Sequence, residues 1–150
     1  ELFIKLIDIA KKYNKTIVIH SRDAIEDTYN IIKETYDEKT KFVMHCYSSS
    51  LEMAKELVKF NVKLGIGGVV TFKNGKRLVE VVENIDIEHL VLETDSPYLA
   101  PEPYRGTINE PKNVYYVAKK ISEIKNMDLD EVINITTANA IAQFDLNISL

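Results

Sequence analysis

The stretch that decides the fold is Leu90-Val-Leu-Glu-Thr-Asp-Ser-Pro-Tyr-Leu-Ala-Pro101. It begins as an apolar run, passes through two acidic residues, Glu93 and Asp95, and ends in a loop marked by prolines. A short apolar run that is closed by turn residues is typical of a buried parallel strand. A carboxylate just after such a strand lies at the edge where α/β proteins keep their active sites. We therefore expect Asp95 to belong to a functional site.

Two earlier apolar runs end in a side chain of a metal-ligand type. In residues 16–20 and 41–45, a run of three apolar residues (17–19 or 42–44) leads to a terminal histidine, His20 or His45. Alone, a histidine at a strand end is more often structural than a ligand, but here it recurs at equivalent places. Because the carboxyl ends of parallel strands meet at one edge of a sheet, we expect both imidazoles to lie near Asp95.

The hydrophobic period switches between two and 3.6 residues four times along the chain, which is typical of a repeated β/α pattern with parallel strands. A long loop over residues 94–111, which holds all four prolines, separates this pattern from a helical end. Strands are expected over residues 16–20, 41–45, 62–66 and 90–93. Helices are expected over residues 1–10, 24–36, 51–60, 76–82, 113–125, 129–135 and 138–144, the last capped by Thr136 or Thr137.

Four β/α units make half of an eight-stranded barrel, and an open sheet with helices on both faces is the rival architecture. In a doubly wound open sheet the ligand binds at one switch point and needs few residues from the outer strands. Here three of the four strands end in potential metal ligands, which indicates that they converge on a common axis. We therefore predict an α/β fold that is half of a (β/α)8 barrel.

Length, charge and cysteine content limit the class of protein. A chain of 150 residues suffices for one domain, and no apolar run approaches the ~20 residues that span a bilayer. The single cysteine, Cys46, excludes a disulfide within the chain and fits a cytoplasmic protein. A net charge of −4 gives no overall attraction to nucleic acid, so any phosphate binding must be local. The chain starts at Glu1 as if midway through a helix, which suggests that an upstream segment is absent.

Imidazole and carboxylate are ligands that zinc, manganese and cobalt accept readily, and a metal-bound water becomes acidic enough to supply hydroxide at neutral pH. Asp95 can bind such a metal and also take the proton from its water. Glu93 is the candidate for a second carboxylate that supports a ligand. The alternative is that Glu93 has a structural role and stabilises the loop.

Three further residues lie in the loops of the same edge. Arg22 and Arg105 are either solvated or contact phosphate oxygens of a substrate. Cys46, next to His45, is either a ligand for a soft metal or a small buried hydrophobe.

The chain resembles the carboxyl-terminal portion of the TatD family of metal-dependent hydrolases. The matching stretches follow the family's order and spacing, except that Tyr47-Ser-Ser stands where Phe-Ser-Gly is more usual. They are residues 17–24, 44–50, 65–73 and 92–101, followed by Arg105-Gly106, residues 109–111, Asn139-Ala140 and Phe144.

The resemblance implies a (β/α)8 barrel with two divalent metal ions (Zn, Mg or Mn) and hydrolysis of phosphodiester bonds in DNA, with RNA as a further substrate to test. His20 and His45 match the metal-binding histidines of strands five and six, and Asp95 matches the metal-binding, catalytic aspartate after strand eight. The family's His-x-His pair and bridging glutamate, which lie on its first four strands, have no counterpart here. Residues 1–150 are thus expected to be a single partial domain, strands five to eight. Such a chain should need the missing half-barrel or self-association, and should have little activity alone.

Two other functions stay open at this point. One is hydrolysis of a small amide, lactone or amine by the same metal chemistry, because an architecture does not fix a substrate. The other is a non-catalytic role as an interaction module or fragment.

Overall fold

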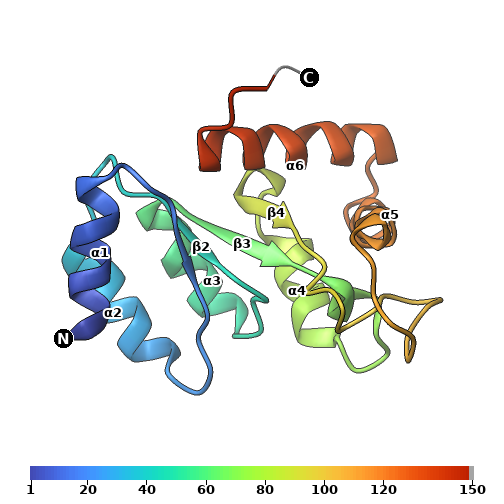
Figure 1. The fold of residues 1–150 in the computed structure, drawn as a ribbon. Helices are drawn as coiled ribbons and strands as arrows, with labels where there is room; N and C mark the ends of the chain where they lie inside the picture. Colours follow the sequence, from blue (N-terminus) through green and yellow to red (C-terminus); the bar gives the residue numbers. More distant parts are fainter. Residues whose placement is uncertain (149–150) are drawn as a thin grey trace.

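The computed structural model describes residues 1–148, which form one parallel sheet packed against helices (Figure 1). Neighbouring strands in the sheet are also consecutive in the chain, in the order β1-β2-β3-β4, and every pair is parallel. A doubly wound sheet would reverse its strand order at a switch point, and this sheet does not. The strands are β1 (Ile17–Ile19), β2 (Phe42–Met44), β3 (Val62–Ile66) and β4 (Leu90–Leu92).

The four strands were predicted in the right places, and β3 was predicted with its observed bounds. The other three are shorter than predicted. As a consequence, His20, His45 and Glu93 lie just past the last residue of β1, β2 and β4 rather than inside the strands. The predicted edge is nevertheless the edge at which all three side chains emerge.

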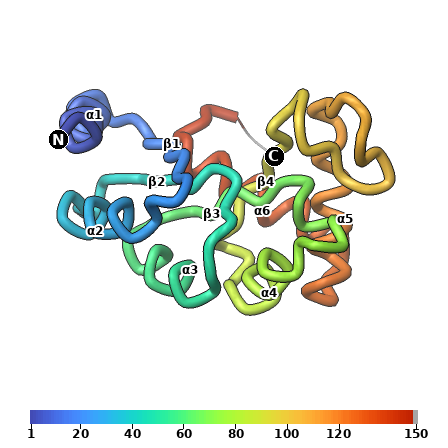
Figure 2. Tube along the Cα trace, turned by 90° about the horizontal axis from the view of Figure 1, so that it is seen from below, coloured from blue at the N-terminus to red at the C-terminus, as the bar shows by residue number. Residues whose placement is uncertain are grey.

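Helices cover one face of the sheet, and Figure 2 shows α2, α3 and α4 on that side, with α1 at the β1 end and α5 at the β4 end. Phe42, Leu64 and Leu90 are buried in the core between the sheet and the helices. The helices are α1 (Leu2–Lys12), α2 (Ile25–Thr35), α3 (Leu51–Leu57), α4 (Lys76–Asn84), α5 (Val114–Lys125) and α6 (Leu129–Phe144). The 3-10 turns are η1 (Val58–Phe60), η2 (Gly68–Thr71), η3 (Ile87–His89) and η4 (Pro111–Asn113).

The chain from Leu129 to Phe144 is one helix, so the prediction of two helices with a break and a threonine cap was wrong. The Thr136 hydroxyl does not cap a new helix: it donates to the Val132 carbonyl one turn earlier, at 2.8 Å, and is buried. A threonine that satisfies its hydroxyl in this way is compatible with a helix interior. The predicted entry through Asp128 is confirmed, since its carboxylate accepts from the backbone N–H of Asp130 at 2.9 Å.

Helix α6 lies across the amino-terminal ends of the strands, opposite the edge that carries the histidines (Figure 1). The buried Gln143 amide donates to the Phe42 carbonyl at the start of β2, at 2.8 Å. The Asn139 amide donates to the Leu90 carbonyl at the start of β4, also at 2.8 Å. The two ends of the sheet therefore differ: one is closed by a helix, and the other carries the polar loops. Among residues 1–148, no helix has the length and apolar character that crossing a bilayer requires.

Candidate metal centre

His45 is the centre of a group of polar side chains at the carboxyl ends of β2 and β4. Its Nδ1 atom lies 3.0 Å from Oε2 of Glu93, and its Nε2 atom lies 3.3 Å from Oδ1 of Asp95. The structure thus brings together a predicted metal ligand, a predicted metal-binding and catalytic carboxylate, and the predicted supporting carboxylate, although β3 separates β2 from β4 in the sheet.

Glu93 reaches His45 because β3, which lies between them, has a glycine at the crossing point. Gly65 pairs with Val91, so Glu93, two residues further along, emerges on the same face as Gly65. A Cβ atom built on Gly65 would lie 2.4 Å from Oε2 of Glu93, well inside van der Waals contact. The space that Gly65 leaves therefore carries the Glu93 side chain over β3.

The second carboxylate oxygen of Glu93 fixes the turn that follows β2. Oε1 of Glu93 accepts the backbone N–H of Cys46 at 2.6 Å. Cys46 has a φ of 47° and Asp95 a φ of 56°, so the chain passes through the left-handed region soon after both strands. A residue with a Cβ atom pays roughly 1–2 kcal/mol for that conformation, and such residues cluster at functional sites. The Glu93 hydrogen bonds hold this turn and orient the imidazole together.

The arrangement of His45 and Asp95 suits a cation between them. An Nδ1–H that donates to Glu93 leaves the Nε2 lone pair facing the Asp95 carboxylate, which is a contact between two acceptors. A proton or a metal ion makes that contact favourable. A tetrahedral ion with ligand distances of about 2.1 Å holds its ligand atoms about 3.4 Å apart. The observed 3.3 Å therefore fits two ligands of one ion.

Cys46 lies at the same place but is a weaker candidate ligand. Ligand atoms of His45, Cys46 and Asp95 all lie within 4.8 Å of one another. Burial raises the pKa of the Cys46 thiol well above its usual range, and the hydrogen bond to Glu93 and the charges of Glu93 and Asp95 raise it further. The thiol is accordingly neutral, whereas a metal binds the thiolate. Cys46 is half-buried, so its burial alone does not distinguish a metal ligand from a small buried hydrophobe.

The other predicted metal ligand, His20, lies beside this group rather than within it. Its ring centre is 6.0 Å from that of His45, with 41° between the ring planes, and its side chain is exposed at the end of β1. The expected meeting of residues 20, 45 and 95 at one edge of the sheet is therefore found. His45 and Asp95 are in contact, and His20 is their neighbour.

The two predicted substrate-binding arginines lie apart from the cavity that adjoins Asp95. Arg22 is exposed in the loop between β1 and α2. The guanidinium carbon of Arg105 lies 4.1 Å from the centre of the Phe72 ring, as a cation–π contact. The arginine that lines the cavity is Arg77, in the first turn of α4. Sequence reasoning missed it because Arg77 follows β3, the one strand that does not end in a potential metal ligand.

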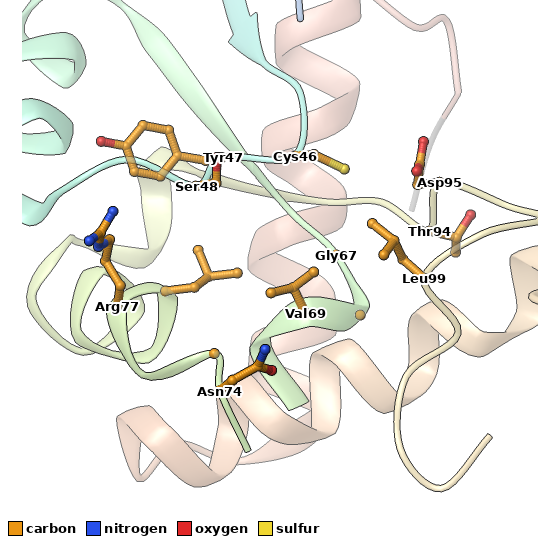
Figure 3. A pocket seen from close by; sticks show the side chains of 13 residues that line it. Cys46, Tyr47, Ser48, Gly67, Val69, Asn74, Arg77, Thr94, Asp95 and Leu99 are labelled. Carbon is orange, nitrogen blue, oxygen red and sulfur yellow. The ribbon is translucent and has the colours of Figure 1, made fainter. Parts of the chain in front are cut away.

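Figure 3 shows this cavity, which has a volume of about 350 Å³ and shares Cys46 and Asp95 with the polar group. Asp95 lies on one side of it and Arg77 on the opposite side. The carboxyl edge of the sheet thus carries a histidine–carboxylate pair with spacing suited to a cation and, directly beside it, a cavity.

Comparison with known proteins identifies the fold and the family. Over 93% of the chain, the structure superposes on YJJV, a TatD homologue from Escherichia coli, with a TM-score of 0.86 and 26% sequence identity, covering 54% of that protein. A structure described as an uncharacterized amidohydrolase from Saccharomyces cerevisiae matches with a TM-score of 0.81 at 21% identity, over 95% of this chain and 58% of that one, and shows the same fold.

Sequence relatives agree with the structural match. The uncharacterized metal-dependent hydrolase YabD of Bacillus subtilis is 47% identical over 147 residues, which are 98% of this chain and 58% of YabD. MJ1582 of Methanocaldococcus jannaschii, described in the same words, is 39% identical over 93% of this chain and 53% of its own length. The chain spans little more than half the length of these relatives. The profile of the family described as TatD related DNase matches residues 1–145. The chain therefore belongs to the TatD-related DNase family.

Proposed function

We propose that these residues form part of a metal-dependent phosphodiesterase that acts on DNA. The observation that carries the proposal is the contact of His45 Nε2 with Asp95 at 3.3 Å, with His45 Nδ1 held by Glu93. Membership of the TatD-related DNase family and the description of relatives as metal-dependent hydrolases agree with this chemistry.

In this proposal His45 Nε2 and Asp95 hold a divalent metal ion, and His20, whose ring centre lies 6.0 Å from that of His45, is a further ligand. The ion, when bound, would lower the pKa of a water molecule toward neutrality. Glu93 keeps the His45 ring in the tautomer whose Nε2 lone pair is free, as second carboxylates do for metal-binding histidines. The free oxygen of Asp95 accepts the proton from the attacking water. The water oxygen forms a bond to phosphorus, the P–O bond to the leaving alkoxide breaks, and that alkoxide takes up a proton.

We further propose that the sheet is half of an eight-stranded barrel, strands five to eight. The sequential strand order supports this, because each strand of a (β/α)8 barrel lies next to its successor. Both edge strands leave apolar groups uncovered. Val18 of β1 is 55% exposed, and Leu92 of β4 lines an apolar cavity of about 360 Å³ between β4, α5 and α6. Further ligands, and a second metal ion, would come from the remaining half, supplied by a longer chain or by a partner. The single cysteine supports a location in the reducing cytoplasm.

The test is metal-dependent release of nucleotides from DNA oligonucleotides by a protein that joins residues 1–150 to the additional segment that the relatives possess. Zinc, magnesium and manganese are compared after removal of metal with a chelator. Asp95→Asn should abolish hydrolysis while leaving the fold intact. Glu123→Gln, which changes an exposed carboxylate on α5, is the matched control and should leave the rate unchanged. We expect residues 1–150 alone to show little activity.

A panel of RNA oligonucleotides and cyclic amides or lactones, run on the same preparation, separates the alternatives. Hydrolysis of an amide or lactone, with DNA left intact, would replace the phosphodiesterase proposal by the amidohydrolase one. Absence of any metal-dependent hydrolysis would leave a binding role only.

A further inference from the structure

The cavity beside Asp95 has walls that the backbone fixes. A Cβ atom on Gly68 would lie 2.1 Å from the Leu99 carbonyl oxygen, and one on Gly75 would lie 2.3 Å from the Val69 carbonyl oxygen. The loop after β4 therefore packs directly on η2, and the turn before α4 also packs against η2. Both approaches need glycine, and together they give a cavity that is formed before any ligand binds.

The lining of the cavity changes in character from one end to the other. Val69 lies between Arg77 on one side and Leu99, next to Asp95, on the other (Figure 3). Leu78 adds a further apolar side chain to the lining, and Asn74 and Arg77 lie away from Asp95. A volume of about 350 Å³ falls within the roughly 300–1,000 Å³ of pockets that hold small organic ligands. An apolar middle with a few polar groups at one end fits a flat ring with hydrogen-bonding edges.

The charges at the two ends are opposite. Asp95 gives one end a negative charge, which a metal ion would compensate. At the other end Arg77 lies in the first turn of α4, which contains no acidic residue and whose N-terminus carries partial positive charge. Arg77 also lines a second cavity of about 180 Å³, together with His45, Cys46 and Ser48. One guanidinium thus borders both spaces that adjoin the candidate metal centre.

We propose that the cavity holds the deoxyribose and base next to the phosphodiester bond to be cleaved, and that Arg77 binds the following phosphate. This inference rests on the proposed function and adds the substrate contacts to it. The base packs between the side chains of Val69 and Leu99, and the Asn74 amide reaches its polar edge. Because apolar packing accepts every base, the pocket selects for a nucleotide and only weakly for sequence. Arg77 takes the role for which the sequence suggested Arg22 and Arg105.

The test is direct binding of a thymidine dinucleotide with a terminal phosphate to residues 1–150, in the presence of a chelator so that no hydrolysis occurs. Binding is followed by amide chemical shifts, and inorganic phosphate is the second probe. Arg77→Ala should weaken dinucleotide binding about tenfold, as expected for loss of a charge-assisted hydrogen bond. Lys76→Ala is the matched control, because Lys76 neighbours Arg77 in the same helical turn and does not line the cavity; it should change binding less than twofold.

Val69→Phe fills the cavity and should abolish dinucleotide binding while leaving phosphate binding unchanged. If that variant does not fold, Asn74→Ala replaces it, because Asn74 is exposed. Asn74→Ala should weaken dinucleotide binding a few-fold. Equal losses in Arg77→Ala and Lys76→Ala, or no dinucleotide binding to the unmodified chain, would overturn the inference. Dinucleotide binding that depends on Arg77, without any metal-dependent hydrolysis, would refute the proposed function and keep the pocket. Hydrolysis of DNA with an unchanged KM in Arg77→Ala would support the proposed function and refute the role of Arg77 in the pocket.

Discussion

Strands β1 and β2 have nearly the same local sequence but different surroundings. Each is a three-residue apolar strand followed by a histidine. Val43, in the middle of β2, is 3% exposed, whereas Val18, its register partner in β1, is 55% exposed. Likewise His45 has a carboxylate beside each ring nitrogen, Glu93 at Nδ1 and Asp95 at Nε2, whereas His20 is exposed. The difference teaches that a strand and the histidine after it become buried and contacted through neighbours on both sides, which β2 has and β1 does not.

The neighbour that matters for His45 is not adjacent in the sheet. Glu93 follows β4 and crosses β3 above Gly65 to reach the end of β2. A side chain at the end of a strand can therefore be fixed by the second strand along, provided that the strand between them leaves room. His20 would gain such support only from additional structure beside β1.

The largest expected effect concerns metal affinity, measured by competition between residues 1–150 and a chromophoric zinc chelator. Glu93→Gln should weaken zinc binding about 10–100-fold, because a neutral amide cannot accept from both the imidazole and the Cys46 N–H. His45→Ala should weaken binding at least as much, and His20→Ala by less than tenfold. Glu83→Gln, an exposed site on α4, is the control and should change nothing. Equal losses for the two histidines would contradict the contrast between β1 and β2.

A second, smaller effect concerns stability, measured by urea unfolding of residues 1–150. Val43→Ala removes two buried methyl groups and leaves a cavity, so it should cost about 2 kcal/mol. Val18→Ala removes the same groups from an exposed position and should change the free energy of unfolding by less than about 0.5 kcal/mol. In a protein where a further strand pairs with β1, the cost of Val18→Ala should rise toward that of Val43→Ala. Similar losses of unfolding free energy for Val18→Ala and Val43→Ala in residues 1–150 would show that the Val18 side chain is already buried.

The smallest effect concerns the link between α1, beside β1, and the start of β2. Asp37 accepts the Thr40 hydroxyl at 2.7 Å and pairs with Lys11 at 2.9 Å, and these contacts hold its pKa well below the ordinary 3.8. Because the folded pKa is depressed, the stabilisation is present above pH 3.8 and is lost as the pH falls below it. Asp37→Asn should therefore lower Tm slightly at neutral pH. The Tm difference between the variant and the unmodified chain should become smaller in acid. A Tm difference that does not depend on pH would mean that the carboxylate charge plays no part.

Local sequence was sufficient to predict most of the secondary structure, because hydrophobic period and turn residues act within a few positions. The bounds of β3 were predicted from the residues alone. The break predicted inside α6 was wrong. A threonine can cap a helix, when its hydroxyl accepts a backbone N–H of the following turn, or lie in a helix interior, when its hydroxyl donates to a carbonyl of the preceding turn.

The sequence by itself determined that His20, His45 and Asp95 lie at one edge of the sheet, since the carboxyl ends of parallel strands share an edge whatever the exact register. Only the tertiary structure decided that Glu93 passes over Gly65 to orient His45, and that Arg77 rather than Arg22 or Arg105 borders the adjoining cavity. The Glu93 contacts join residues 28 and 48 positions apart, and the packing of strands and loops sets all of these distances. Spacing along the chain therefore determines which groups reach an edge, and packing determines which of them touch.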